Sequence, residues 1–161
     1  MSNSSIGDSL PQTSLAILDV AGPVAHLTMR RDDVFNALNP QLIDDITQLL
    51  EWTRDRSVAE QGSLTDGSGA PFLRVVVLSG AGPHFCAGAD IDWMRASGAQ
   101  SAEENRADAA RLDRLFNSLH SHPCFTIGNV QGVALGGGAG LVACCDHVLV
   151  ESDARIALSE G

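Results

Sequence analysis

Two turns of small residues carry the main chemical signal of this sequence. The first reads Phe-Cys-Ala-Gly-Ala-Asp over residues 85–90, and the second reads Leu-Gly-Gly-Gly-Ala-Gly over residues 135–140. Each follows an apolar, β-rich run, and side chains of this size let backbone N–H groups come close to a ligand. Two such turns can direct two amides at one oxygen atom, which is the geometry of an oxyanion hole. The alternative is that the glycines only allow a helix to pack closely on a sheet.

The runs on either side of these turns predict the elements that position them. Apolar patterns predict strands over residues 15–20, 24–29, 72–78, 124–130, 147–151 and 155–158. Helical spacing and capping residues predict helices over residues 40–54, 101–120 and 138–145. Residues 57–71 predict a flexible loop, and residues 1–13 a disordered tail. We therefore expect one α/β domain over residues 14–161, built from repeated β-β-α units.

Composition restricts the partners and the setting of the protein. Twenty acidic and ten basic residues give a net charge of −10, which disfavours nucleic acid and anionic membrane surfaces. A membrane-spanning helix needs about 18 consecutive apolar residues, and no run in the sequence approaches that length. The first residues lack the features of a signal peptide. The four cysteines predict reduced core thiols, and the five histidines share no metal-ligand spacing. We expect a cytoplasmic protein without a metal ion.

The two turns also resemble the signature segments of a known family, the crotonase or enoyl-CoA hydratase/isomerase superfamily. The matching segments are residues 84–91 and 129–140, and Asn-Ala-Leu-Asn over residues 36–39 is similar to the family's turn before its first helix. The resemblance implies a crotonase-like spiral of β-β-α units. It also implies an acyl-CoA substrate, whose thioester oxygen the amides of Ala89 and Gly137 hold as an enolate.

The resemblance further implies which residues bind the coenzyme A arm and which acid acts. The matching positions for the arm are Ala37, Ala87, Ala89, Asp90, Ile91 and Gly137. Coenzyme A is then part of the substrate, and no separate cofactor is expected. Family hydratases with two catalytic glutamates carry the first where Gly140 stands here. The second corresponds to Glu160, fourteen residues after Asp146, and is the one acid–base candidate retained.

Three further segments resemble a bacterial subgroup that acts on branched glutaconyl-CoA thioesters. They are residues 93–94, 139–146 and 158–160, and the subgroup includes methylglutaconyl-CoA and isohexenylglutaconyl-CoA hydratases of leucine and acyclic terpene breakdown. The prediction is therefore hydration of a branched enoyl-CoA, with a substrate carboxylate or an ordered water in place of the missing acid. Isomerisation by Glu160 alone is the alternative.

Two other interpretations of the sequence remain open. Family members continue beyond residue 161 into helices that close the acyl pocket and build a trimer or a dimer of trimers. The resemblance thus implies a chain without those C-terminal helices, and a non-catalytic family member is one alternative. The other is a nucleotide-binding oxidoreductase, because residues 138–143 satisfy the pattern Gly-x-Gly-x-x-Ala after a strand. That pattern lies close to the end of the chain and is a weak signal.

Overall fold

Two β-sheets form the frame of the molecule, and the computed structural model describes them within residues 5–158. The larger sheet has five strands in the order β1-β2-β3-β4-β6, and the smaller pairs β5 with β7. The strands are β1 (Ala16–Ala21), β2 (Val24–Met29), β3 (Val75–Gly80), β4 (Phe125–Val130), β5 (Val133–Leu135), β6 (His147–Val150) and β7 (Arg155–Ala157). The β1-β2 pair is antiparallel and every other pair is parallel. The carboxyl ends of β2, β3 and β4 therefore meet at one edge of the larger sheet.

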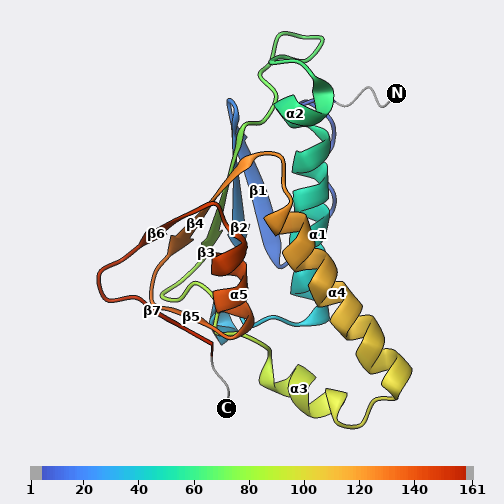
Figure 1. Cartoon of the computed structure of the whole chain (residues 1–161), viewed down its shortest axis with the longest axis vertical. Helices are drawn as coiled ribbons and strands as arrows, with labels where there is room; N and C mark the ends of the chain where they lie inside the picture. The colour runs from blue at the N-terminus through green and yellow to red at the C-terminus, as the bar shows by residue number, and fades with distance from the viewer. Residues whose placement is uncertain (1–4, 159–161) are drawn as a thin grey trace.

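Helices cover one face of the larger sheet and connect its parallel strands (Figure 1). The described helices are η1 (Asp32–Val34), α1 (Pro40–Asp55), α2 (Val58–Gln61), α3 (Ile91–Ser97), α4 (Ala102–His120) and α5 (Gly137–Cys144). Of these, α1 and α5 contact strands of the larger sheet. Helix α1 contacts β1 and β2, and α4 packs against both α1 and α5. Among the described residues, no helix has both the length and the apolar character needed to cross a membrane.

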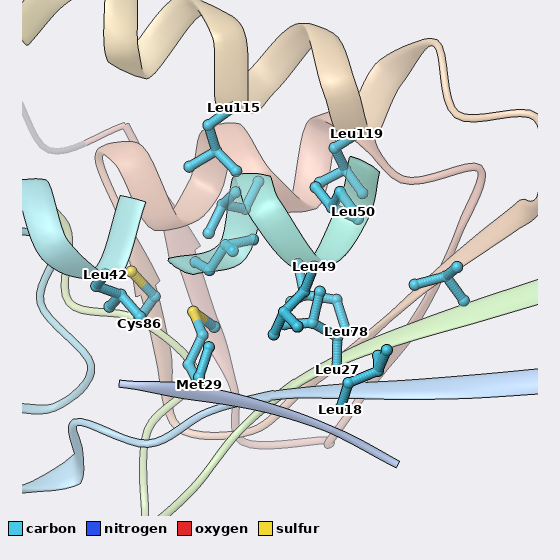
Figure 2. Close-up of a cluster of buried hydrophobic side chains, with 14 of the residues drawn as sticks. Leu18, Leu27, Met29, Leu42, Leu49, Leu50, Leu78, Cys86, Leu115 and Leu119 are labelled. Atoms are coloured by element: carbon cyan, nitrogen blue, oxygen red, sulfur yellow. The ribbon is translucent and has the colours of Figure 1, made fainter. Parts of the chain in front are cut away.

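The core lies between the sheet and helices α1 and α4. The Asn39 side chain accepts a hydrogen bond from the Leu42 N–H at 2.9 Å, and Pro40 occupies the first helical position, so α1 begins where the sequence predicts. Figure 2 shows side chains of α1 and α4 meeting those of the sheet. The labelled members are Leu18, Leu27, Met29, Leu42, Leu49, Leu50, Leu78, Cys86, Leu115 and Leu119. Each large apolar side chain buried in this way contributes about 1.5–3 kcal/mol.

The predicted α/β class is confirmed, and most predicted elements lie within a few residues of their observed bounds. Helix α3 and strand β5 were not predicted. Helix α3 has no buried residue and therefore no apolar periodicity, and β5 is only three residues long.

The predicted flexible loop over residues 57–71 contains helix α2 and a turn around a buried carboxylate. Asp66 accepts the N–H groups of Ser68 and Ala70, each at 2.9 Å, and the hydroxyl of Ser5 at the same distance. The Ser68 hydroxyl donates to the same carboxylate at 2.7 Å, and together with the other donors it holds the pKa of Asp66 well below its usual range. The segment is therefore ordered and not flexible, because the Asp66 carboxylate holds the turn through hydrogen bonds that the composition of the segment does not indicate.

The N-terminal residues also differ from the prediction of a disordered tail over residues 1–13. Within the described part, residues 5–13 lie against α1: Arg56 pairs with Asp8 at 2.8 Å, and the Trp52 indole donates to the Ser9 carbonyl at 3.2 Å. The Arg56 guanidinium stacks 4.1 Å above the Trp52 ring. These contacts extend the folded region to the N-terminal side of residue 14.

Candidate active site

The two small-residue turns are in direct backbone contact. Cys86 donates its N–H to the Val133 carbonyl at 3.1 Å and accepts the Leu135 N–H at 3.0 Å. A Cβ placed on Gly88, whose φ is +96°, would lie 2.8 Å from the Leu135 carbonyl oxygen. A Cβ placed on Gly138 would overlap the Cys86 carbonyl. The small residues are therefore needed where the two turns touch, and both interpretations of the glycines, close packing and presented amides, remain compatible with this contact.

The Ala89 amide faces away from the segment that pairs with it. Leu38 donates its N–H to the Gly88 carbonyl at 2.7 Å and accepts the Asp90 N–H at 2.8 Å, which makes a parallel bridge between Leu38 and Ala89. In such a bridge the N–H of the central residue points to the opposite side. Within residues 5–158, the structure shows no acceptor for the Ala89 N–H.

Helix α5 begins at the second turn, and its first N–H groups have no acceptor inside the helix. Gly136 precedes the helix with φ +53° and ψ −115°, and its carbonyl accepts the Gly140 N–H at 3.0 Å. The N–H groups of Gly137 and Gly138 come before this first helical bond, so they have no acceptor inside the helix. A Cβ on Gly137 would lie 2.8 Å from Cδ1 of Leu38. Leu38 thus contacts both amide-bearing segments.

A cavity of about 520 Å³ opens beside the first turn. It is lined by five of the six residues predicted to bind the coenzyme A arm: Ala37, Ala87, Ala89, Asp90 and Ile91. The sixth, Gly137, is not part of its lining, and the catalytic candidate Glu160 lies outside the described residues.

The cavity wall also contains residues that the sequence analysis missed. Phe35 is 49% exposed, adopts φ +57° and meets the His84 ring edge-on at 4.8 Å. Together with Val34 and the 66% exposed Ile91, it gives the cavity an apolar rim. A large side chain in the left-handed region is uncommon, but nothing in the local sequence apart from the following Asn36 suggests that conformation.

Both carboxylate oxygens of Asp90 bind groups of the protein itself. Its Oδ1 accepts the Trp93 N–H at 2.9 Å and so begins α3, while its Oδ2 pairs with Nη1 of Arg31 at 2.8 Å. Because the Trp93 N–H donates to the carboxylate and the Arg31 guanidinium lies beside it, the pKa of Asp90 is below its usual range. Asp90 therefore lines the cavity as an ionised helix cap.

An aromatic ring covers the position at which the sequence lacks an acid. A Cβ placed on Gly140 would lie 2.9 Å from Cζ of Phe116, a residue of α4. Any larger side chain at Gly140 requires the Phe116 ring to move. The absence of an acid at this position is thus matched by the packing around it.

The remaining polar candidates have structural roles. Asp146 accepts the N–H and hydroxyl of Thr126, at 2.9 and 3.2 Å, and joins the start of β6 to β4. His122 is buried, accepts the Cys124 N–H at 3.1 Å and lies 2.9 Å from the Thr53 hydroxyl. Trp93 donates to Asp108 at 3.1 Å and so ties α3 to α4.

The nucleotide-binding alternative does not match the observed topology. Residues 138–143 lie in α5, which follows β5, and β5 pairs with β7 in a two-stranded sheet and makes one further bridge, from Ala134 to Cys86. A dinucleotide site instead requires this turn at the carboxyl end of a strand in an extended parallel sheet. The Gly-x-Gly-x-x-Ala match is therefore incidental to the fold.

Known proteins share both the sequence pattern and the fold. A family model described as enoyl-CoA hydratase/isomerase matches residues 19–161. The (E)-benzylidenesuccinyl-CoA hydratase of Thauera aromatica is 30% identical over 147 residues, which cover 89% of this chain and 49% of that protein. Crotonyl-CoA hydratase of Syntrophomonas wolfei is 29% identical over 145 residues, with 89% and 49% covered. The crystal structure of an enoyl-CoA hydratase from Shewanella pealeana is 33% identical, with a TM-score of 0.75 over 86% of this chain and 47% of that one.

The family match includes both turns and nearly every element of the fold. The chain spans about half the length of the curated relatives that it matches. The family match itself begins in β1 and extends through α5 and β7. From these findings together, the chain belongs to the enoyl-CoA hydratase/isomerase family, the crotonase superfamily that the two turns resemble.

Proposed function

We propose that the protein acts on an acyl-CoA thioester, whose carbonyl oxygen is bound between the amides of Ala89 and Gly137. The observation that carries the proposal is the Ala89 N–H, which faces away from Leu38 and has no acceptor within the described residues. The N–H groups at the start of α5, which have no acceptor inside the helix, lie in the adjoining turn. An enolate oxygen carries nearly a full negative charge, and each preorganised donor to such an oxygen contributes about 2.7–4 kcal/mol.

The cavity beside Ala89 is the proposed site of the coenzyme A arm. Its volume of about 520 Å³ is within the range of small-molecule pockets. Ala37, Ala87 and Ile91 provide small or apolar wall groups for a pantetheine chain, and Arg95 is the cation in the lining. The net charge of −10 does not attract the phosphates of coenzyme A, so local amides and Arg95 have to hold them.

The proposed reaction is hydration of a branched, glutaconyl-type enoyl-CoA, with Glu160 as the acid–base residue. The names of the Thauera and Syntrophomonas relatives describe hydratases, and the sequence resemblance to glutaconyl-type enzymes supports the branched acyl chain. The cysteines and the family resemblance support a cytoplasmic protein of leucine degradation that forms a trimer or a dimer of trimers.

Isomerisation by Glu160 alone is the second candidate. It is favoured by the glycine at position 140 and by the Phe116 ring beside it, which would have to move to admit a second carboxylate there. A single base can move a proton between two carbons of the enolate, whereas hydration also needs a group that activates water.

Turnover of defined thioesters tests the proposal. The purified 161-residue chain is incubated with methylglutaconyl-CoA or crotonyl-CoA, and the loss of enoyl absorbance is followed. We expect turnover that Glu160→Gln abolishes while coenzyme A binding persists, with Glu151→Gln, at an exposed residue, as the matched control. Double-bond migration without addition of water would support isomerisation. Absence of both binding and turnover would contradict the proposal.

A further inference from the structure

We propose that Asn36 is a positioning residue for the Ala89 amide, and that Arg31 is its second support. The inference rests on the proposed function, because it concerns how the same oxyanion donor is aimed. Neither Asn36 nor Arg31 lines the cavity. Each acts through the segment that carries Leu38.

Leu38 sets the direction of the Ala89 N–H. Its N–H and carbonyl bond to the Gly88 carbonyl and the Asp90 N–H, at 2.7 and 2.8 Å. These two bonds fix the peptide planes on both sides of Ala89. A displacement of Leu38 relative to the first turn therefore rotates the Ala89 amide away from its target.

The Asn36 side chain ties the Leu38 segment to the turn that follows β3. Asn36 is fully buried, at 0% exposure. Its carbonyl oxygen accepts the Arg31 N–H at 2.8 Å, and its amide nitrogen donates to the carbonyls of Ala81 and His84, each at 2.9 Å. Both side-chain N–H groups and the side-chain oxygen are therefore used. Ala81 and His84 follow Asn36 by 45 and 48 positions in the sequence, and they lie at the two ends of the turn after β3.

The backbone around Asn36 is held in a conformation that needs such support. Phe35 and Asn36 both have φ +57°. Two consecutive residues in the left-handed region cost of order 1–3 kcal/mol each, less for asparagine than for phenylalanine. The conformation brings the Phe35 carbonyl to the Ala87 N–H at 3.0 Å. The hydrogen bonds of Asn36 thus maintain a second contact with the first turn.

Arg31 supports the same segment from its other side. Its Nη1 lies 2.8 Å from Oδ2 of Asp90 and 2.7 Å from the Ala37 carbonyl. Asp90 follows Ala89, and Ala37 precedes Leu38, so one guanidinium joins the neighbours of both bridge partners. The pair is largely buried, with side-chain exposures of 18% for Arg31 and 9% for Asp90. Charged hydrogen bonds of this kind are stronger than neutral ones.

Replacement of Asn36 by aspartate isolates the hydrogen bonds from the volume. Asn36→Asp has nearly the same shape but places a carboxylate oxygen against the Ala81 and His84 carbonyls, where two N–H donors stood. The two carbonyls lose their donors and repel the new charge. We expect the Leu38 segment to shift and the Ala89 N–H to lose its alignment, while the apolar wall of the cavity persists.

The test uses acetoacetyl-CoA, a 3-oxoacyl thioester whose enolate absorbs in the near ultraviolet. A site that holds the thioester oxygen with two amides lowers the pH at which the bound ligand forms its enolate, without any turnover. For Asn36→Asp we expect this pH midpoint to rise by about one to two units, a tenfold to hundredfold loss of enolate stabilisation. The dissociation constant of free coenzyme A should change by less than about twofold, because only the oxyanion donor is misaligned.

Matched variants separate an effect on the position of the Ala89 amide from effects on the stability of the fold and on the charge of the protein. Asn117→Asp makes the same chemical change at an exposed residue of α4 and should leave the enolate midpoint unchanged. His122→Gln weakens a buried network in a different part of the fold and should lower thermal stability without moving the midpoint. If Asn36→Asp does not fold, Arg31→Gln is expected to raise the midpoint by the same mechanism.

The outcomes distinguish this inference from the proposed function. If the wild-type chain does not bind acetoacetyl-CoA, the proposed function is wrong and the inference fails with it. If the wild-type chain stabilises the enolate and the folded variants at Asn36 and Arg31 do so equally well, the oxyanion site stands and the positioning role is wrong. A raised midpoint with unchanged coenzyme A affinity supports both.

Discussion

Replacement of Gly88 by alanine measures how tightly the two small-residue turns are packed. Two costs are expected from the structure. Gly88 has φ +96°, where an L-residue costs about 1–2 kcal/mol. The new Cβ would also lie 2.8 Å from the Leu135 carbonyl oxygen, which is backbone and cannot rotate away. Overpacking of this kind costs about 1–3 kcal/mol, so Gly88→Ala should lower the free energy of unfolding by about 2–5 kcal/mol.

A second glycine separates the two costs. Gly62 has φ +64°, and a Cβ at that position meets nothing within 4 Å, so Gly62→Ala carries only the conformational cost. The difference between the two variants in urea-induced unfolding should be about 1–3 kcal/mol, and thermal unfolding should show it as roughly 2–12 °C. The reasoning would be refuted if Gly88→Ala were no more destabilising than Gly62→Ala, because the two turns would then not be in contact.

Two further predictions concern His122 and Gly140. Burial lowers the pKa of His122 from 6.5 to about 4. Between these two pH values, His122 is protonated in the unfolded chain and neutral in the folded chain. His122 should therefore contribute a stability that is complete above pH 6.5 and declines by about 3 kcal/mol as the pH falls to 4, and urea unfolding of His122→Gln should lack this dependence. Gly140→Glu should lower the melting temperature because its side chain meets the Phe116 ring, and adding Phe116→Ala should recover part of that loss; no recovery would show that the ring is not the obstacle.

Local patterns were sufficient to predict most of the fold. The Asn39-Pro40 pair and the apolar spacing after it predict α1, and the β-branched run before Gly80 predicts β3. The strands and the longer helices bury regular faces, and that regularity is visible in the sequence. Helix α3 has no such face, since Asp90 starts it and its side chains are partly or fully exposed, so no periodicity indicated it.

The candidate site was predicted only in part. The small residues Ala37, Ala87 and Ala89 were expected to lie together, and they line one cavity. The partners that hold them could not be predicted, because the Asn36 side chain bonds to residues 45 and 48 positions away. Such pairing depends on the three-dimensional path of the chain, and no spacing rule along the sequence reports it.

In the proposed function, the Gly137 N–H is one of the two donors to the substrate oxygen. Gly137 is the first residue of α5, a position that accepts proline, so Gly137→Pro removes the N–H while the helix can still begin there. Gly137→Ala is the matched control, because it places a similar Cβ against Leu38 but retains the N–H.

The most direct measurement compares these two variants for enolate formation from bound acetoacetyl-CoA. Loss of one oxyanion donor costs about 10²–10³-fold, so the enolate midpoint of Gly137→Pro should lie about two to three pH units above that of Gly137→Ala, with similar coenzyme A affinity. Equal midpoints in two folded variants that bind coenzyme A would contradict the account, because the substrate oxygen would then not be held by the Gly137 amide.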